Sequence, residues 1–124
     1  MKPKTIVVVG ASRGIGKAMV DLLASYSEHR VVALSRNLDR MNEAFSRYEN
    51  VECYSLDLNS KLVRVNCENI FSNLESIDIL INNAGHLVNK PFSEISRKDF
   101  EDCYNINVIS VMETVQAALE KMNS

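Results

Sequence analysis

Apolar residues along the chain occur either in short unbroken runs or at the three- and four-residue spacing of a helix face. Residues 5–9 form an unbroken run of β-branched side chains, which is typical of a parallel strand covered on both faces. Further strands are predicted at 30–34, 51–56 and 77–81. Helices are predicted at about 15–28, 38–48, 59–74 and 97–122, where apolar residues return at helical spacing.

This alternation of four strands with four helices predicts an α/β fold of the doubly wound, Rossmann type. Successive parallel strands are joined by right-handed crossovers, so helices should cover a parallel sheet. The doubly wound order places the strands as 3-2-1-4 and leaves residues 77–81 at an edge. Ligands of such sheets bind beyond the carboxyl ends of the strands, where the strand order reverses, so functional residues are expected there.

Composition narrows the class of protein. The 124 residues, of which 46% are hydrophobic, predict a single folded domain over residues 1–124. A net charge of −2 with scattered basic residues gives no reason to expect nucleic acid as a partner. Cys53, Cys67 and Cys103 lack C-x-x-C spacing, so neither disulfides nor a metal site are expected, and a cytoplasmic location fits. The apolar run near the N-terminus is too short for a signal peptide or a membrane span.

The first strand leads into a glycine-rich loop, Gly10-Ala11-Ser12-Arg13-Gly14-Ile15-Gly16. Glycines let the backbone turn sharply and approach a pyrophosphate, which the N-terminus of the following helix then stabilises. The loop therefore predicts a dinucleotide site, although its spacing, G-x-x-x-G-x-G, differs from the commonest fingerprint, G-x-G-x-x-G. The alternative is that these glycines only make a tight turn from strand to helix.

The end of the second strand bears on the choice between NAD and NADP. A site selective for NAD needs an acidic residue there to bind the ribose hydroxyls, but the chain has Ser35 and Arg36. A guanidinium and a hydroxyl suit a 2′-phosphate, and Arg13 in the glycine loop lies where it can pair with the same group. The sequence therefore favours NADP over NAD. The alternative is that both arginines are solvated surface residues.

With these motifs the sequence resembles the short-chain dehydrogenase/reductase family of NAD(P)-dependent oxidoreductases. The loop from Gly10 to Gly16 matches the family's T-G-x-x-x-G-I-G pattern, except that Val9 stands where threonine is usual. Asp57-Leu58, after the third strand, resembles the segment that carries the family's adenine-contacting aspartate.

Two further motifs follow the fourth strand. Asn82-Asn83-Ala84-Gly85 matches the family's N-N-A-G signature, whose backbone lies against the adenosine ribose. Asn107 resembles the family's active-site asparagine, which positions a water molecule in a proton relay. The resemblance thus implies one catalytic residue, Asn107, and a set of cofactor-binding residues. That set comprises Gly10, Ser12, Arg13, Gly14, Ile15, Gly16, Ser35, Arg36, Asp57, Leu58, Asn83, Ala84 and Gly85.

The resemblance implies hydride transfer between NADP and a carbonyl or alcohol substrate, but every matched motif belongs to the N-terminal half of a family member. The family's catalytic serine and Tyr-x-x-x-Lys lie beyond that half, and no tyrosine of this chain is followed by lysine four positions later. A tyrosine without such a lysine is a poor base at neutral pH. The chain as given is therefore expected to bind cofactor without appreciable turnover. The alternative is a non-catalytic module that binds a dinucleotide or another subunit.

The last strand and the last helix both predict apolar surface without a partner. The strand at 77–81 is apolar yet expected at a sheet edge, and the helix at 97–122 is apolar on more than one face. Self-association is therefore expected. Of the two histidines, His29 is expected at the surface, and His86 is expected to be a solvated residue near the cofactor.

Overall fold

The computed structural model describes residues 2–122 and contains a parallel sheet with the strand order β3-β2-β1-β4. The strands are β1 (Thr5–Val9), β2 (Arg30–Ser35), β3 (Val51–Ser55) and β4 (Ile79–Asn82). The helices are α1 (Gly14–Ala24), α2 (Leu38–Phe45), α3 (Val63–Phe71), α4 (Arg97–Tyr104) and α5 (Ser110–Met122). The predicted doubly wound α/β fold and its strand order are both confirmed.

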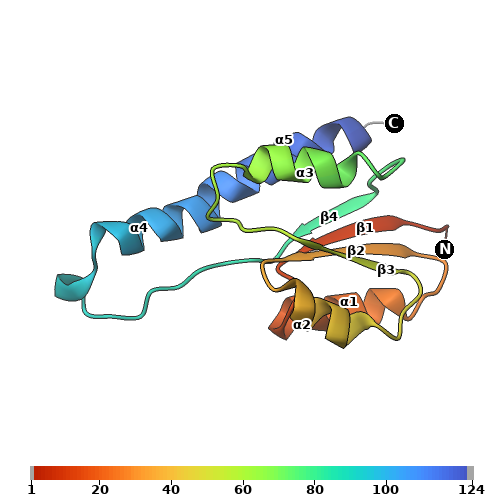
Figure 1. Ribbon diagram of the computed structural model, residues 1–124, viewed down its shortest axis with the longest axis horizontal. Helices are drawn as coiled ribbons and strands as arrows, with labels where there is room; N and C mark the ends of the chain where they lie inside the picture. Colours follow the sequence, from red (N-terminus) through yellow and green to blue (C-terminus); the bar gives the residue numbers. More distant parts are fainter. Residues whose placement is uncertain (1, 123–124) are drawn as a thin grey trace.

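Helices cover both faces of the sheet. Figure 1 shows α1 and α2 on one face, and α3 and α5 on the other. Side chains of β1 alternate between the two layers: Ile6 and Val8 pack on the α1 and α2 side, whereas Val7 and Val9 pack on the α3 and α5 side. Because both faces of β1 are buried, its sequence is an unbroken apolar run.

The central strand β1 carries the point at which the strand order reverses. It pairs with β2 from Thr5 to Val9, and with β4 from Ile6 to Val9. The chain moves outward from β1 to β2 and β3, then crosses to the other side of β1 to form β4. Loops that leave β1 and β4 therefore separate at the carboxyl edge of the sheet, which is where such folds bind ligands.

The single helix predicted at 97–122 is wrong in one respect, since a π-helical segment, Asn105–Ile109, separates α4 from α5. Within it, the backbone N–H of Ser110 donates to the carbonyl of Asn105, one residue farther than an α-helix allows. The Ser110 hydroxyl also donates to the carbonyl of Ile106 at 2.6 Å. Apolar spacing does not reveal such a segment, because the helix continues in the same direction on both sides.

The fourth strand begins two residues later than predicted. Ile77 is buried in the α3 and α5 core, and its backbone N–H donates to Lys121 O at 2.8 Å. Asp78 joins the start of β1, since its carboxylate accepts from the backbone N–H of Thr5 at 2.8 Å. Ile79 is 41% exposed, as expected of an edge strand with no neighbour on its outer side among the described residues.

The expectation that His29 lies at the surface is wrong. Its side chain is only 3% exposed, and its Nδ1 accepts from the backbone N–H of Lys4 at 3.0 Å. The amide of Asn50 donates to the His29 carbonyl at 3.0 Å. These bonds join the turn before β2 to the residue before β1 and to Asn50, so His29 is a structural residue.

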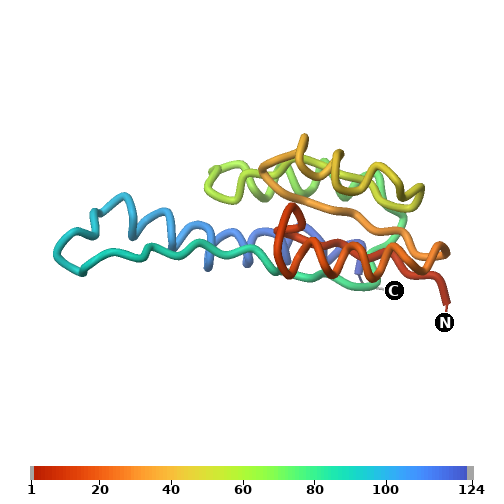
Figure 2. The backbone as a smooth tube through the Cα atoms, turned by 90° about the horizontal axis from the view of Figure 1, so that it is seen from below, coloured from red at the N-terminus to blue at the C-terminus, as the bar shows by residue number. Residues whose placement is uncertain are grey.

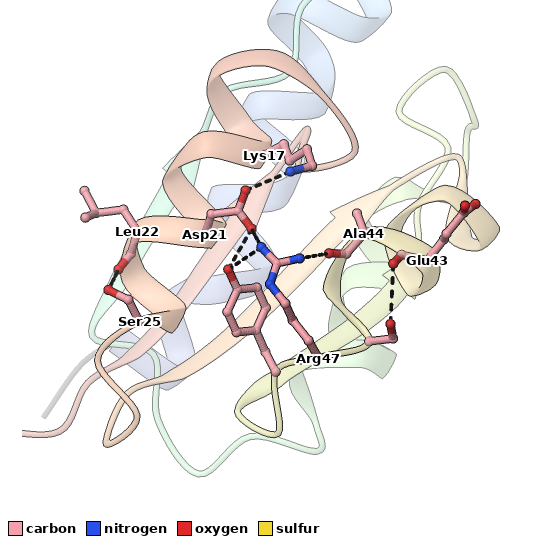
Figure 3. Close-up of polar contacts among 9 residues, drawn as sticks. Lys17, Asp21, Leu22, Ser25, Glu43, Ala44 and Arg47 are labelled. Carbon is pink, nitrogen blue, oxygen red and sulfur yellow. Dashed lines mark hydrogen bonds and ion pairs between the residues drawn. The ribbon is translucent and has the colours of Figure 1, made fainter.

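A polar cluster around Asp21 joins α1 to the segment after α2 (Figure 3). The Asp21 carboxylate accepts from Lys17 at 2.8 Å, from Arg47 at 3.1 Å and from the Tyr48 hydroxyl at 2.9 Å. Burial on its own would raise the pKa of Asp21, but hydrogen bonds from Lys17 and Tyr48 lower it overall. Arg47 also donates to the carbonyl of Ala44 at 2.9 Å. The cluster fixes the two helices that cover one face of the sheet.

The segment between β4 and the π-helical segment forms an arm that extends away from the sheet, as Figures 1 and 2 show. None of the residues in α4 is buried, so polar contacts hold the arm. Ser96 and Asp99 form a capping box at the start of α4, and Lys90 pairs with Asp99 at 2.6 Å. Over residues 2–122, no helix has both the length and the apolar character needed to cross a membrane.

Candidate functional site

A cleft of about 310 Å³ lies at the carboxyl ends of β1 and β2, next to the segment that follows β4. It therefore occupies the point where the strand order reverses, as the fold predicts. Its walls come from the glycine loop, the β2–α2 turn, the turn after β3, the segment after β4 and the π-helical segment. The lining residues are Val9, Gly10, Ser12, Arg13, Leu34, Ser35, Arg36, Asn37, Arg40, Leu56, Asp57, Leu58, Ala84, Gly85, His86 and Ile106.

Two glycines of the loop are required by the packing of the protein itself. A Cβ on Gly10, which has a φ of +85°, would lie 2.7 Å from the backbone of Ala84. A Cβ on Gly16 would lie 1.9 Å from the carbonyl oxygen of Gly10. Gly14 is different: it has a φ of +60°, but no atom lies within 4 Å of an added Cβ. The loop thus packs against the segment after β4 and against α1, while leaving open space at its middle glycine.

The N-terminus of α1 suits an anion. Arg13 is its N-cap residue but makes no capping hydrogen bond, and the first turn contains no acidic side chain. The first backbone N–H groups of a helix have no partners within the helix, and the helix dipole favours negative charge there. This arrangement fits a pyrophosphate, the group that the glycine loop predicts.

The β2–α2 turn brings basic side chains to the cleft. Ser35, Arg36 and Arg13 line it as predicted, together with Arg40 from the first turn of α2, which the sequence analysis missed. Asn37 caps α2, because its Oδ1 accepts from the backbone N–H of Arg40 at 3.0 Å. The signal for Arg40 was present in the sequence, because it is a further basic residue in the first turn of the helix predicted after Arg36.

The turn after β3 is fixed to the arm. Asp57 Oδ1 accepts from the backbone N–H of Asn59 at 3.0 Å. The Asn59 side chain donates to Asp102 at 2.9 Å and accepts from Asn105 at 3.2 Å. Asn59 thereby holds the turn that carries Asp57 and Leu58 against the start of the π-helical segment. The sequence analysis did not identify this contact, because its partners lie more than forty residues apart.

Two asparagines hold backbone segments at the cleft. The Asn83 amide donates to the carbonyl of Gly10 at 3.1 Å, which joins the end of β4 to the glycine loop. Asn107 Oδ1 accepts from the backbone N–H of His86 at 2.8 Å, and its Nδ2 donates to the carbonyl of His86 at 2.9 Å. Asn107 makes both bonds from within the π-helical segment. Its role in a proton relay stays a prediction.

Most predicted cofactor residues line the cleft, namely Gly10, Ser12, Arg13, Ser35, Arg36, Asp57, Leu58, Ala84 and Gly85. Gly14, Ile15, Gly16, Asn83 and Asn107 are not among the lining residues. Gly16, Asn83 and Asn107 instead support its walls, as described above. Ile15 is 72% exposed at the start of α1.

The cysteines lie outside the cleft. Burial raises the pKa of the Cys67 thiol to about 11, so this side chain is a neutral core residue. Burial also raises the pKa of Cys53. Within the described part of the chain, no group of three His, Cys, Asp or Glu side chains is arranged to hold a metal ion.

A parallel sheet covered by helices on both faces, with a basic cleft at its switch point, defines a Rossmann-type α/β unit. The family model described as short chain dehydrogenase matches residues 4–124. The chain belongs to this family, whose members are oxidoreductases that bind a nicotinamide dinucleotide.

Individual relatives agree with this assignment. The chain is 33% identical over 121 residues to carbonyl reductase family member 4 of Xenopus laevis, covering 96% of this chain and 50% of the relative. It is 35% identical over 124 residues to gluconate 5-dehydrogenase of Gluconobacter oxydans, covering 94% of this chain and 47% of the relative. The chain spans about half the length of the curated relatives it matches.

A solved structure shows the same fold. The alcohol dehydrogenase of the archaeon Thermococcus sibiricus, complexed with 5-hydroxy-NADP, superposes with a TM-score of 0.84 at 26% sequence identity. The match covers 98% of this chain and 54% of that chain.

Proposed function

We propose that this chain forms the NADP-binding half of a short-chain dehydrogenase/reductase that transfers hydride between the nicotinamide cofactor and a carbonyl or alcohol substrate. The observation that carries the proposal is the cleft at the switch point, where Arg36 follows β2 at the position that an acidic residue occupies in NAD-selective sites, and Arg13 of the glycine loop lines the same cleft. The alcohol dehydrogenase of Thermococcus sibiricus, whose structure contains 5-hydroxy-NADP, supports the choice of NADP.

Different residues of the cleft are assigned to different parts of the cofactor. In the proposal, the glycine loop and the uncapped N-terminus of α1 hold the pyrophosphate, and Ser35, Arg36 and Arg13 hold the 2′-phosphate. As the family resemblance implies, Asp57 and Leu58 would contact the adenine, and Ala84 and Gly85 would contact the adenosine ribose.

NADP would supply the hydride chemistry when bound, and Asn107 holds the backbone next to the cleft. Its two hydrogen bonds to His86 fix the segment that follows Gly85. We infer that this positioning keeps the end of the cleft in shape, and that Asn107 orients a water molecule in the proton relay, as the family resemblance implies. The three free cysteines agree with a proposed location in the cytoplasm.

Substitution of Arg36 by Asp tests the cofactor assignment. The change should weaken binding of NADPH by about 1.5–3 kcal/mol, the value of a hydrogen bond to a charged group. Binding of NADH should weaken much less. Calorimetric titration of each cofactor measures the difference. Arg64→Asp is the matched control, because Arg64 lies on α3 outside the cleft. Equal NADPH affinity before and after Arg36→Asp would exclude the assignment.

A non-catalytic dinucleotide-binding module is the second candidate, because the same cleft would hold a dinucleotide in either case. Both candidates predict cofactor binding without appreciable turnover for the chain as given, and they differ once the catalytic residues are supplied. Adding a relative's C-terminal half should restore turnover of ketones and aldehydes if the chain is half an enzyme. Turnover at ~1–10³ s⁻¹ by the chain alone, surviving Asn107→Ala, would show that the catalytic group is misassigned.

A further inference from the structure

The arginines of this chain fall into two groups. Each arginine outside the cleft is ion-paired: Arg30 with Glu52, Arg47 with Asp21, Arg64 with Glu68 and Arg97 with Glu101. Arg13, Arg36 and Arg40 all line the cleft, and none of them has an acidic partner among residues 2–122. The arginine side chains without an acidic partner are thus concentrated where a ligand would bind.

From this we infer that Arg40 is a further residue that binds the 2′-phosphate of NADP, together with Arg13 and Arg36; the inference rests on the proposed function. The β2–α2 turn determines where Arg40 lies. The Ser35 hydroxyl accepts from the backbone N–H of Asn37 at 3.3 Å, and the Asn37 side chain accepts from the backbone N–H of Arg40 at 3.0 Å. These bonds fix the backbone between Arg36 and Arg40, so both residues line one cleft.

Charge explains why a third arginine belongs here. A phosphate monoester carries about −1.5 to −2 charges at neutral pH and three strong acceptor oxygens. Guanidinium groups recognise such oxygens with paired N–H donors, and their mutual repulsion in an empty cleft is relieved when the anion binds. Asn37 uses its Oδ1 atom to cap α2, and Arg40 is the cationic side chain of this helix turn that lines the cleft.

The test uses two nucleotides that differ only in the group at issue, 2′,5′-ADP and 5′-AMP. Calorimetric titration of the purified protein should show tighter binding of 2′,5′-ADP. Arg40→Gln should lower the affinity for 2′,5′-ADP about tenfold, at the lower end of the range for a lost charged hydrogen bond. The affinity for 5′-AMP should change by less than about twofold. The substitution leaves the backbone N–H of residue 40 in place. This N–H still donates to Asn37 Oδ1, so α2 retains its cap.

Control variants separate this inference from the proposed function. Arg64→Gln removes an arginine outside the cleft and should change the affinity for neither nucleotide. If Arg36→Gln lowers the preference for 2′,5′-ADP but Arg40→Gln leaves it unchanged, the inference about Arg40 is wrong and the proposed function stands. If the unsubstituted protein binds both nucleotides equally, the NADP assignment is wrong, and the inference is wrong with it. Thermal unfolding of each variant checks that the fold is unchanged.

Discussion

Gly16 shows how a missing side chain sets the distance between α1 and β1. An added Cβ would lie 1.9 Å from the carbonyl oxygen of Gly10 and 2.7 Å from the amide nitrogen of Asn83. The first of these is a backbone atom that the fold holds in place, because Gly10 accepts from Asn83 and donates to Leu34. A side chain at position 16 would therefore push the helix away from the sheet.

We expect Gly16→Ala to reduce the free energy of unfolding by about 3 kcal/mol, at the upper end of overpacking costs. Urea denaturation measures the change. Gly85→Ala is the matched control, because its nearest atom, Asn107 Oδ1, would lie 3.6 Å from the new Cβ. That control should alter stability by no more than about 0.5 kcal/mol. Similar losses in the two variants would show that close packing at Gly16 is not the cause.

At the scale of elements, the arm and α4 depend on polar contacts. Ser96 and Asp99 cap the helix reciprocally, and Lys98 pairs with Asp102 at 2.8 Å. Asn59, in the turn after β3, donates to Asp102 of α4. Asn107, in the π-helical segment, accepts from His86 in the segment after β4. Because these bonds connect directly to the walls of the cleft, the arm contributes to the shape of the site.

The titration of Asp99 tests how the arm is held. Hydrogen bonds from Lys90 and from the backbone N–H of Ser96 lower the pKa of Asp99 from 3.8 to about 2. A lowered pKa means that the contribution of this carboxylate to stability is present above about pH 3.8 and is lost as the pH falls through about 2. The carboxyl ¹³C shift of Asp99 should therefore titrate near pH 2.

Lys90→Met removes the largest cause of the shift and should raise that midpoint toward 3.8. Arg97→Met is the control, because Arg97 pairs with Glu101 and not with Asp99. A midpoint that stays near 2 in Lys90→Met would show that Lys90 does not hold this carboxylate.

At the scale of the whole molecule, apolar side chains near α5 and the outer edge of the sheet remain exposed. Met112 and Val108 are 52% and 49% exposed, and the outer edge of β4 pairs with no strand among the described residues. Exposed edges and apolar helix faces favour pairing with another chain. The predicted self-association would bury the exposed face of α5 and the outer edge of β4.

Met112→Glu should shift the purified chain toward monomer, because it places a charge on the exposed face of α5. Light scattering across a dilution series measures the mass. Leu22→Glu is the matched control: Leu22 is 62% exposed but lies on α1, on the other face of the sheet (Figure 1). A compact monomer of the unsubstituted chain across the whole series would contradict the prediction.

Much of the fold could be predicted because each element carries a local signal. The apolar run of β1 and the helical spacing after Ile15 arise from burial on both faces of the strand and on one face of the helix. The prediction was wrong where backbone contacts decided the outcome. His29 is buried because its Nδ1 accepts from Lys4, and Ile77 lies outside β4 because its N–H donates to Lys121.

The sequence alone determined the order of the elements, the glycine loop and the basic residues after β2, because these depend on residue type and short spacing. Only the tertiary structure decided which residues meet at the cleft. Arg40 joins Arg13 and Arg36 because β1 and β2 are parallel neighbours whose carboxyl ends meet at the cleft, and Asn107 reaches His86 from a π-helical segment. Contacts between residues distant in the chain depend on how the strands are ordered and how the helices pack, and a linear pattern carries no direct record of either.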